Sequence, residues 1–453
     1  MKSPNRAPGT SSKKSQEKGA LYKVLPLLIL AALFLLGGLL MSQAALAQEQ
    51  MLPEEAEALE AEEGDEEDSE VSGRIFGGEV SGYVAGELRV FPETAAYAGQ
   101  KGEFLSFSGQ PEFYRAWEDG RQSFTLIPFF RLDPQDDDRT HADLRELTWM
   151  QVGERWELRL GVRRLFWGVT ESRHLVDVIN QTDAVEGLDG EDKLGQPMVN
   201  LALIRDWGTL DLLWLPWFRE RTFAGPKGRP RPGLMVDHDR SRYASSSEER
   251  HQDWAIRWSH AIGAVDLGIS HFQGTSRDPL FLTEMYTTGQ VVLVPYYDQI
   301  RQTGLDLQFT DEAWLWKLEV LSRRGEFDGR RTEAVGGFEY SMVGIFESDA
   351  DMGLIAEYLF DDRGDASTQP FDNDLMVGMR LTMNDTQSTD AVIGTIIDLE
   401  DGTMAWTLEG SRRLGESWKL TLEGRAYLDP PTSDPIYTYR RDHLLSLEIA
   451  RYF

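Results

Sequence analysis

The chain has 453 residues, no cysteine and 76 acidic against 46 basic side chains, which gives a formal net charge of −30 at pH 7. This sign argues against a nucleic-acid partner, because phosphate binding requires positive charge. Apart from one segment near the N-terminus, no apolar run is long enough to cross a bilayer as a helix, so the composition also argues against a helical membrane protein.

Residues 1–47 have the three parts of a secretory signal peptide. A basic region precedes an apolar core from Val24 to Leu40, and Ala45-Leu46-Ala47 forms a small-residue cleavage site before Gln48. We expect cleavage after Ala47. The alternative is an uncleaved anchor, since the core reaches 17 residues, close to the lower limit for a spanning helix. Removing residues 1–47, which carry six basic and one acidic side chain, leaves a net charge of −35.

Residues 48–72 form an acidic tail. Between Gln48 and Glu70 there are twelve acidic side chains and no basic one, a composition too charged to bury its own backbone. We predict a disordered, solvated spacer. Two alternatives are a docking segment for a basic partner and a binding region for divalent ions.

From residue 73 onward the chain repeats segments of about ten residues in which apolar and polar side chains alternate. In residues 418–427, charged and hydroxyl groups alternate with Trp418, Leu420 and Leu422. Successive side chains of a strand point to opposite faces, and a transmembrane β-barrel needs one face for lipid and one for water. Segments 156–163 and 314–320 share the pattern and also begin with Trp, the residue of interfacial aromatic girdles.

Eighteen segments fit this pattern, so we predict an all-β fold in which residues 73–453 form a transmembrane antiparallel β-barrel of 16–18 strands. The segments are 81–91, 103–117, 123–132, 143–151, 156–163, 198–206, 210–217, 254–260, 264–272, 304–310, 314–320, 334–345, 352–360, 375–383, 391–398, 403–412, 418–427 and 444–453. A soluble β-sandwich is the alternative, but it explains neither a signal peptide combined with a terminal Phe nor the strands that start with Trp.

Short turns alternate with long connections along these segments, as they do in outer-membrane barrels. Placing the long connections outside the cell requires Val291–Tyr297 to belong to a loop, and it puts the acidic tail and Phe453 on the periplasmic side. The last segment, apolar on one face and closed by Phe453, resembles the outer-membrane assembly signal, although Arg451 departs from that pattern. The resemblance implies that Phe453 engages the barrel assembly machinery in a Gram-negative bacterium.

With the apolar faces toward lipid, charges of both signs point into the lumen, which a barrel of this size can keep hydrated. The candidate pore-lining residues are Arg159, Arg163, Arg257, Lys317, Glu319, Arg380, Glu423 and Arg425. The connection after Arg163 offers Arg173, Asp177 and Asp183 as candidates for a constriction formed by an inward-folded loop. The alternative is a loop that caps the barrel.

The same connection carries a family resemblance. Its start, Arg163-x-x-x-Trp167-Gly168 followed by spaced Asp and Asn residues, resembles the large outer-membrane porin-like families, including the alginate-export type. This resemblance implies a channel and does not indicate which substrate passes through it. A second candidate gate lies between Arg277 and Gln302, where aromatic and polar residues mix, with simple loop packing as the alternative.

A basic run in the acidic chain comprises Arg219, Arg221, Lys227, Arg229 and Arg231. On an extracellular loop these groups would meet lipopolysaccharide phosphates or attract anions. Solvated loop charge is the alternative.

We therefore expect a porin-like outer-membrane channel for passive or facilitated passage of small hydrophilic solutes. The alternatives are a non-transporting structural or adhesion barrel and an export conduit with a periplasmic partner. No catalysis is predicted, because the one suggestive pair, Ser270 and His271, points to opposite faces of its strand. No cofactor or metal is predicted, since phosphate-loop, HExxH and Cys/His spacings do not occur. Expected partners are outer-membrane lipid, lipopolysaccharide, the assembly machinery and small solutes, and the porin-like resemblance implies a homotrimer.

Overall fold

The computed structural model describes residues 73–75, 77–327, 329–364, 367 and 369–453. The predicted signal peptide and the predicted acidic tail lie outside the described residues. Among the described residues, no helix has the length and apolar character needed to cross a bilayer.

The described residues form strands joined by loops and short 3-10 helices. The strands are β1 (Gly73–Ile75), β2 (Gly78–Val90), β3 (Glu103–Trp117), β4 (Gln122–Leu132), β5 (His141–Val152), β6 (Trp156–Arg163), β7 (Gln196–Arg205), β8 (Gly208–Leu215), β9 (Arg242–Tyr243), β10 (Asp253–Ile262), β11 (Val265–Thr275), β12 (Leu280–Met285), β13 (Val291–Tyr297), β14 (Gln299–Asp311), β15 (Trp314–Gly325), β16 (Arg330–Met342), β17 (Asp351–Asp361), β18 (Asn373–Thr382), β19 (Asp390–Asp398), β20 (Met404–Leu414), β21 (Trp418–Leu428) and β22 (Leu444–Tyr452). The 3-10 helices are η1 (Asp137–Arg139), η2 (His238–Arg240), η3 (Glu248–Arg250), η4 (Ile345–Glu347) and η6 (Pro435–Tyr439).

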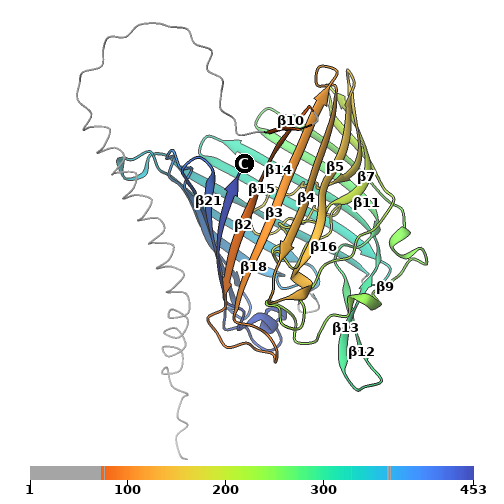
Figure 1. Cartoon of the computed structure of the whole chain (residues 1–453), viewed down its shortest axis with the longest axis vertical. Coiled ribbons are helices and arrows are strands. Elements are labelled where there is room, and N and C mark those ends of the chain that lie inside the picture. Colours follow the sequence, from red (N-terminus) through yellow and green to blue (C-terminus); the bar gives the residue numbers. More distant parts are fainter. Residues whose placement is uncertain (1–72, 76, 328, 365–366, 368) are drawn as a thin grey trace, which may run out of the picture.

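Eighteen strands close into one antiparallel barrel (Figure 1), which confirms the predicted fold class. They are β2–β8, β10, β11 and β14–β22, and each overlaps one of the predicted segments. The ring closes where β22 pairs with β2. There the amide of Gly82 donates to the carbonyl of Phe453 (3.1 Å), and the amide of Phe453 donates back (3.0 Å). Gly82 has φ of +140°, and a Cβ would lie 2.4 Å from the carbonyl oxygen of Gln110, so the closure point requires glycine.

A second sheet stands outside the barrel wall. Strands β12 and β13 form an antiparallel hairpin, and β9 pairs with β13 in parallel. The hairpin projects beyond the barrel at the end that carries the long connections (Figure 1). The prediction that Val291–Tyr297 is loop was therefore wrong, since this segment is β13, but β13 adds no strand to the ring and the alternation of connections is unchanged.

The outer face of the barrel carries exposed apolar side chains in the alternating positions of most strands. Examples are Val84, Leu88, Leu105, Phe107, Leu212, Ile256, Ile269, Leu354, Val377, Leu447 and Ile449, each more than a third exposed. Near the short-turn end, Trp314, Trp316, Phe338 and Tyr340 pack together with ring centroids 4.6–5.6 Å apart. An apolar belt with an aromatic cluster at its edge is the surface that a bilayer requires of a spanning barrel.

The inner face is less polar than alternation alone suggests. Leu213, Leu215 and Phe272 form one buried apolar cluster on the inside of the wall, and Leu321 and Val335 belong to a second. These strands therefore carry apolar groups on both faces, because the inner apolar groups pack against a loop that enters the lumen.

Candidate functional site

The connection between β6 and β7, residues 164–195 (the inner loop), enters the barrel. Three buried carboxylates on neighbouring strands bind its first half. Glu319 of β15 accepts hydrogen bonds from the amides of Val169 (2.6 Å), Thr170 (3.0 Å) and Val176 (3.1 Å). Glu357 of β17 accepts from the amides of residues 171 and 172 at 2.7 and 2.8 Å. Glu333 of β16 forms an ion pair of 3.1 Å with residue 173. Each carboxylate is at most 1% exposed, so the loop's polar groups replace the water that these charges need.

Apolar contacts support the same half of the inner loop. Val178 and Ile179 join the inner cluster of Leu213, Leu215 and Phe272, and Leu175 joins the cluster of Leu321 and Val335. Burial of these side chains fixes the loop backbone against the wall, because each buried aliphatic group contributes about 1.5–3 kcal/mol.

The other half of the inner loop reaches the opposite wall. Arg131 of β4 pairs with Glu186 (2.7 Å), and Arg145 of β5 pairs with Asp183 (2.7 Å). Arg425 of β21 forms an ion pair with residue 189. The loop thus crosses the lumen from β15–β17 to β4, β5 and β21, and it narrows whatever passage remains.

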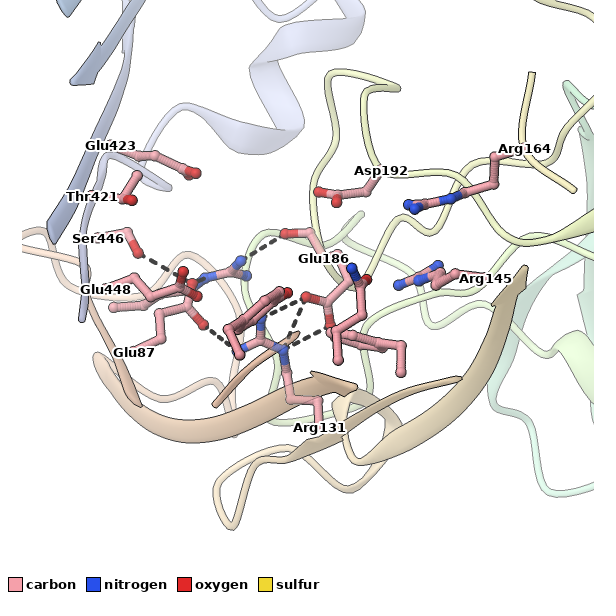
Figure 2. Close-up of a pocket in the computed structure, with 14 residues that line it drawn as sticks. Glu87, Arg131, Arg145, Arg164, Glu186, Asp192, Thr421, Glu423, Ser446 and Glu448 are labelled. Carbon is pink, nitrogen blue, oxygen red and sulfur yellow. Dashed lines mark hydrogen bonds and ion pairs between the residues drawn. The ribbon is translucent and has the colours of Figure 1, made fainter. Parts of the chain in front are cut away.

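A cavity of about 200 Å³ lies between the inner loop and the wall formed by β2–β5, β21 and β22 (Figure 2). Five carboxylates and four guanidinium groups line it. They are Glu87, Glu186, Asp192, Glu423, Glu448, Arg89, Arg131, Arg145 and Arg164.

Most of the arginines around this cavity are already neutralised. Glu87, 5% exposed, pairs with Arg89 (2.7 Å), Arg131 (2.7 Å) and Arg139 (2.5 Å), and Glu186 shares Arg131. This network fixes the floor of the cavity in one arrangement, because removing any partner would leave a buried charge uncompensated.

The remaining charges are unpaired and mainly acidic. Within the part of the chain that the structure describes, no hydrogen bond or ion pair involves the side chains of Asp192, Glu423, Glu448 or Arg164. Figure 2 shows Asp192 and Arg164 across the cavity from Glu423 and Glu448. Three free carboxylates against one free guanidinium give this constriction a net preference for positive charge.

One of the free carboxylates titrates near neutral pH. Asp192 is accessible from the lumen, but enclosure by the surrounding protein, followed by repulsion from Glu186 and Asp189, raises the pKa of its carboxyl to about 7. The charge of the constriction therefore changes over the physiological pH range.

The predicted pore-lining residues divide into three groups. Glu423 lines the cavity. Lys317, Glu319 and Arg380 hold the inner loop, since Lys317 and Arg380 both reach its Glu171, at 3.7 and 2.7 Å, and Arg425 does so through Asp189.

The third group lies on the inner wall outside the cavity lining. Arg159 pairs with Glu157, Arg163 donates to Asn200 (2.9 Å), and Arg257 pairs with Asp306 (2.6 Å). The side chain of Arg257 also covers the Trp167 ring of the inner loop at 5.1 Å.

The predicted constriction residues lie within the inner loop, where they stabilise its fold. Arg173 pairs with Glu333. Asp177 accepts from the amides of residues 167 and 168 and pairs with Lys193. Burial raises the pKa of Asp183, but the hydrogen bond with His141 and the ion pair with Arg145 outweigh burial and lower the pKa to about 2. None of the three contributes to the lining of the cavity, and Phe453 lies at the barrel closure described above.

Sequence reasoning missed the wall residues that do line the cavity. Glu87, Arg89 and Arg131 occupy alternating positions of amphipathic strands, so the same inward-charge rule would have found them. Asp192 carries no such signal, because its position depends on how the inner loop folds.

The loop residues of the predicted basic run are largely neutralised. Arg219 pairs with Asp143, Arg221 with Asp278 and Arg229 with Asp442. Lys227 lies 3.5 Å from Asp137, and the Arg231 guanidinium covers the Tyr97 ring. These groups connect the long loops to one another and to β5.

Two other arrangements bear on chemistry. Ser270 is buried on the inner face, whereas the ring of His271 contacts Thr303 on the outer face, so the two do not meet. Asp398, Asp401 and Asp434 bring carboxylate oxygens within 4.8 Å of one another, a spacing that oxygen-preferring divalent cations accept.

No family model matches the chain, and the comparison with curated protein sequences finds no match. Among solved structures, it is similar to engineered variants of the porin of Rhodopseudomonas blastica. One has a TM-score of 0.42 at 9% identity and another, a triple mutant, 0.40 at 10%; each alignment covers 83% of this chain and 99% of the porin. The closed strand register and the apolar outer belt define the class. The chain folds as an 18-strand antiparallel β-barrel of the transmembrane type.

Proposed function

We propose that this barrel is an outer-membrane channel for small hydrophilic solutes, and that its constriction favours cations. The observation that carries the proposal is the set of free carboxylates beside the inner loop. Glu423 and Glu448 lie on the wall across the cavity from Asp192. Neither has a hydrogen-bond or ion-pair partner among the residues that the structure describes, whereas most of the arginines around them are paired. In a narrow passage with low-dielectric walls, such charges raise the local concentration of the opposite ion.

A plugged, non-transporting scaffold is the second candidate. The observation that favours it is the number of anchors on the inner loop, which include three buried carboxylates on β15–β17 and two apolar clusters. The two functions differ in whether the passage along β21, β22 and β2 is continuous.

Reversal potentials across a planar bilayer under a salt gradient distinguish them. Refolded residues 48–453 should give stable single-channel steps with a cation preference, and Glu423→Gln combined with Glu448→Gln should move the reversal potential toward zero. Glu154→Gln combined with Glu416→Gln, in the exposed β5–β6 and β20–β21 turns, is the matched control for loss of two negative charges outside the constriction. A heat-modifiable, folded barrel without steps would support the scaffold, and an unchanged potential in the double variant would contradict the proposed selectivity.

A further inference from the structure

A row of three arginines lies on the outer face of the barrel at the end with the long connections. Arg301 of β14 is the Cα partner of Arg324 of β15, and Arg324 is the Cα partner of Arg330 of β16. All three side chains are exposed. Because neighbouring strands lie about 4.8 Å apart, the row spans about 10 Å.

Three facing positive charges without a counter-charge are unfavourable in a sheet. Within the described residues, none of the three arginines forms an ion pair, and the one side-chain contact of the row is a 3.5 Å hydrogen bond from Arg330 to Ser322. Two acids lie close to the row, Glu326 two residues after Arg324 and Asp362 beside Thr332. Among the described residues, neither forms an ion pair with the row.

The inner side of the same strands shows how the chain neutralises such a pair when it does so internally. Arg323 and Arg331 also face each other across β15 and β16. Asp278 lies between them, 2.7 Å from Arg323 and 3.9 Å from Arg331. Among the described residues, no acid pairs with the outer row in the way that Asp278 pairs with the inner one. This leaves the counter-charge of the outer row to a group outside the chain.

The depth of the row identifies the kind of counter-charge. Directly below it, Thr303, Ser322 and Thr332 form a row of hydroxyl side chains. Apolar rows follow, first Leu305, Val320 and Ala334, then Leu307, Leu318 and Gly336, and aromatic rings at Phe309, Trp316 and Phe338 come next. The register thus runs from basic to hydroxyl to apolar to aromatic groups.

These rows span the thickness of a membrane belt. Arg324 and Trp314 are ten residues apart on β15, which corresponds to about 25 Å along the barrel axis for a strand tilted by about 40°. The apolar belt of outer-membrane barrels has the same height. The arginine row therefore sits at the polar boundary of the outer leaflet, where lipid phosphates lie.

We propose that Arg301, Arg324 and Arg330 bind the phosphates of an outer-leaflet glycolipid of the lipopolysaccharide type. Guanidinium groups bind phosphate oxygens in bidentate geometry, and the hydroxyl row beneath offers further donors to the headgroup while the apolar rows contact its acyl chains. This site lies outside the lumen and does not depend on the proposed conduction.

Native mass spectrometry of refolded residues 48–453 with bisphosphorylated lipid A tests the proposal. The variant with Arg301→Gln, Arg324→Gln and Arg330→Gln should lose affinity by on the order of ten- to a hundredfold, and Arg324→Gln alone should lose part of it. The matched control replaces Arg121, Arg155 and Arg413, which are exposed at the short-turn end, by Gln and should bind normally. The temperature of the gel shift between folded and unfolded barrel should be the same for the triple variant as for the parent, and this establishes its fold.

Three outcomes would overturn the proposal. They are equal lipid A affinity in the parent and the triple variant, equal affinity of the parent for dephosphorylated lipid A, and displacement of lipid A by inorganic phosphate at the lipid's concentration. The last result would assign the row to free anions, because a site built for the lipid also uses its acyl chains.

Discussion

Replacing Glu319 by Gln should loosen the inner loop without opening the barrel. The Glu319 side chain is fully buried and accepts four hydrogen bonds from residues 169–176, three on Oε1 and one on Oε2. An amide keeps one acceptor oxygen, but its NH₂ group then faces a loop donor. With the amide oxygen at the Oε1 position, the hydrogen bond from the amide of Val176 is lost. A hydrogen bond to a charged acceptor contributes about 1.5–3 kcal/mol, so the anchor weakens by at least this amount, and the three remaining bonds also weaken because their acceptor is no longer charged.

The expected signature is electrical. Glu357 and the apolar clusters still hold the inner loop, so Glu319→Gln should give a higher mean conductance and more open-channel noise than the parent, with the barrel still folded. Asp211→Asn is the control, since Asp211 lies on the inner wall and, among the described residues, its side chain has Asn200 as its one hydrogen-bond partner. Single-channel recordings in which Glu319→Gln matches both the parent and this control would refute the idea that the buried carboxylate anchors a loop beside the conduction path.

Three further predictions concern charge and assembly. Because the pKa of Asp192 is raised to about 7, lowering the pH from 8 to 6 should protonate this carboxyl and reduce cation selectivity. The selectivity of Asp192→Asn should not change between these pH values. The folded chain binds this proton more tightly than the unfolded chain, so the free energy of unfolding should fall as the pH rises toward 7. Glu87→Gln leaves Arg89 and Arg131 without their shared counter-charge and should lower the free energy of unfolding by about 3–5 kcal/mol. The gel shift between folded and unfolded barrel should then occur at a lower temperature. An unchanged temperature would contradict a stabilising role of the network. Deleting Phe453 removes both hydrogen bonds to the β2 closure and should reduce the amount of barrel assembled in outer membranes, so normal levels on immunoblots would count against its role as an assembly signal.

The strands could be predicted because a membrane barrel imposes a period of two on every one of them. The segment 418–427 shows this directly, since the polarity of each side chain indicates which face of the strand it occupies. Val291–Tyr297 shows the limit of the method. Placing all long connections on one side of the membrane predicts a loop at this segment, but a strand can also pair outside the ring, as β13 does with β12.

The candidate site was less predictable because its contacts are long-range. The inner loop was expected as a constriction, but its anchors Glu319 and Glu357 lie about 150 and 185 residues further along the chain, and periodicity says nothing of which inward charge meets which loop amide. The outer arginine row has the same character. The sequence shows the pairs Arg323-Arg324 and Arg330-Arg331, but only the register separates the two inner arginines from the two outer ones.

Chemical accessibility at the constriction tests the central claim most directly. The chain has no cysteine, so Glu423→Cys places a single thiol in the cavity and Leu447→Cys places one on the outer apolar belt. A positively charged methanethiosulfonate reagent, added from either side of a bilayer that holds single channels, should reduce the conductance of Glu423→Cys and leave Leu447→Cys unchanged. Full conductance of Glu423→Cys after labelling confirmed by mass would show that ions do not pass beside the inner loop.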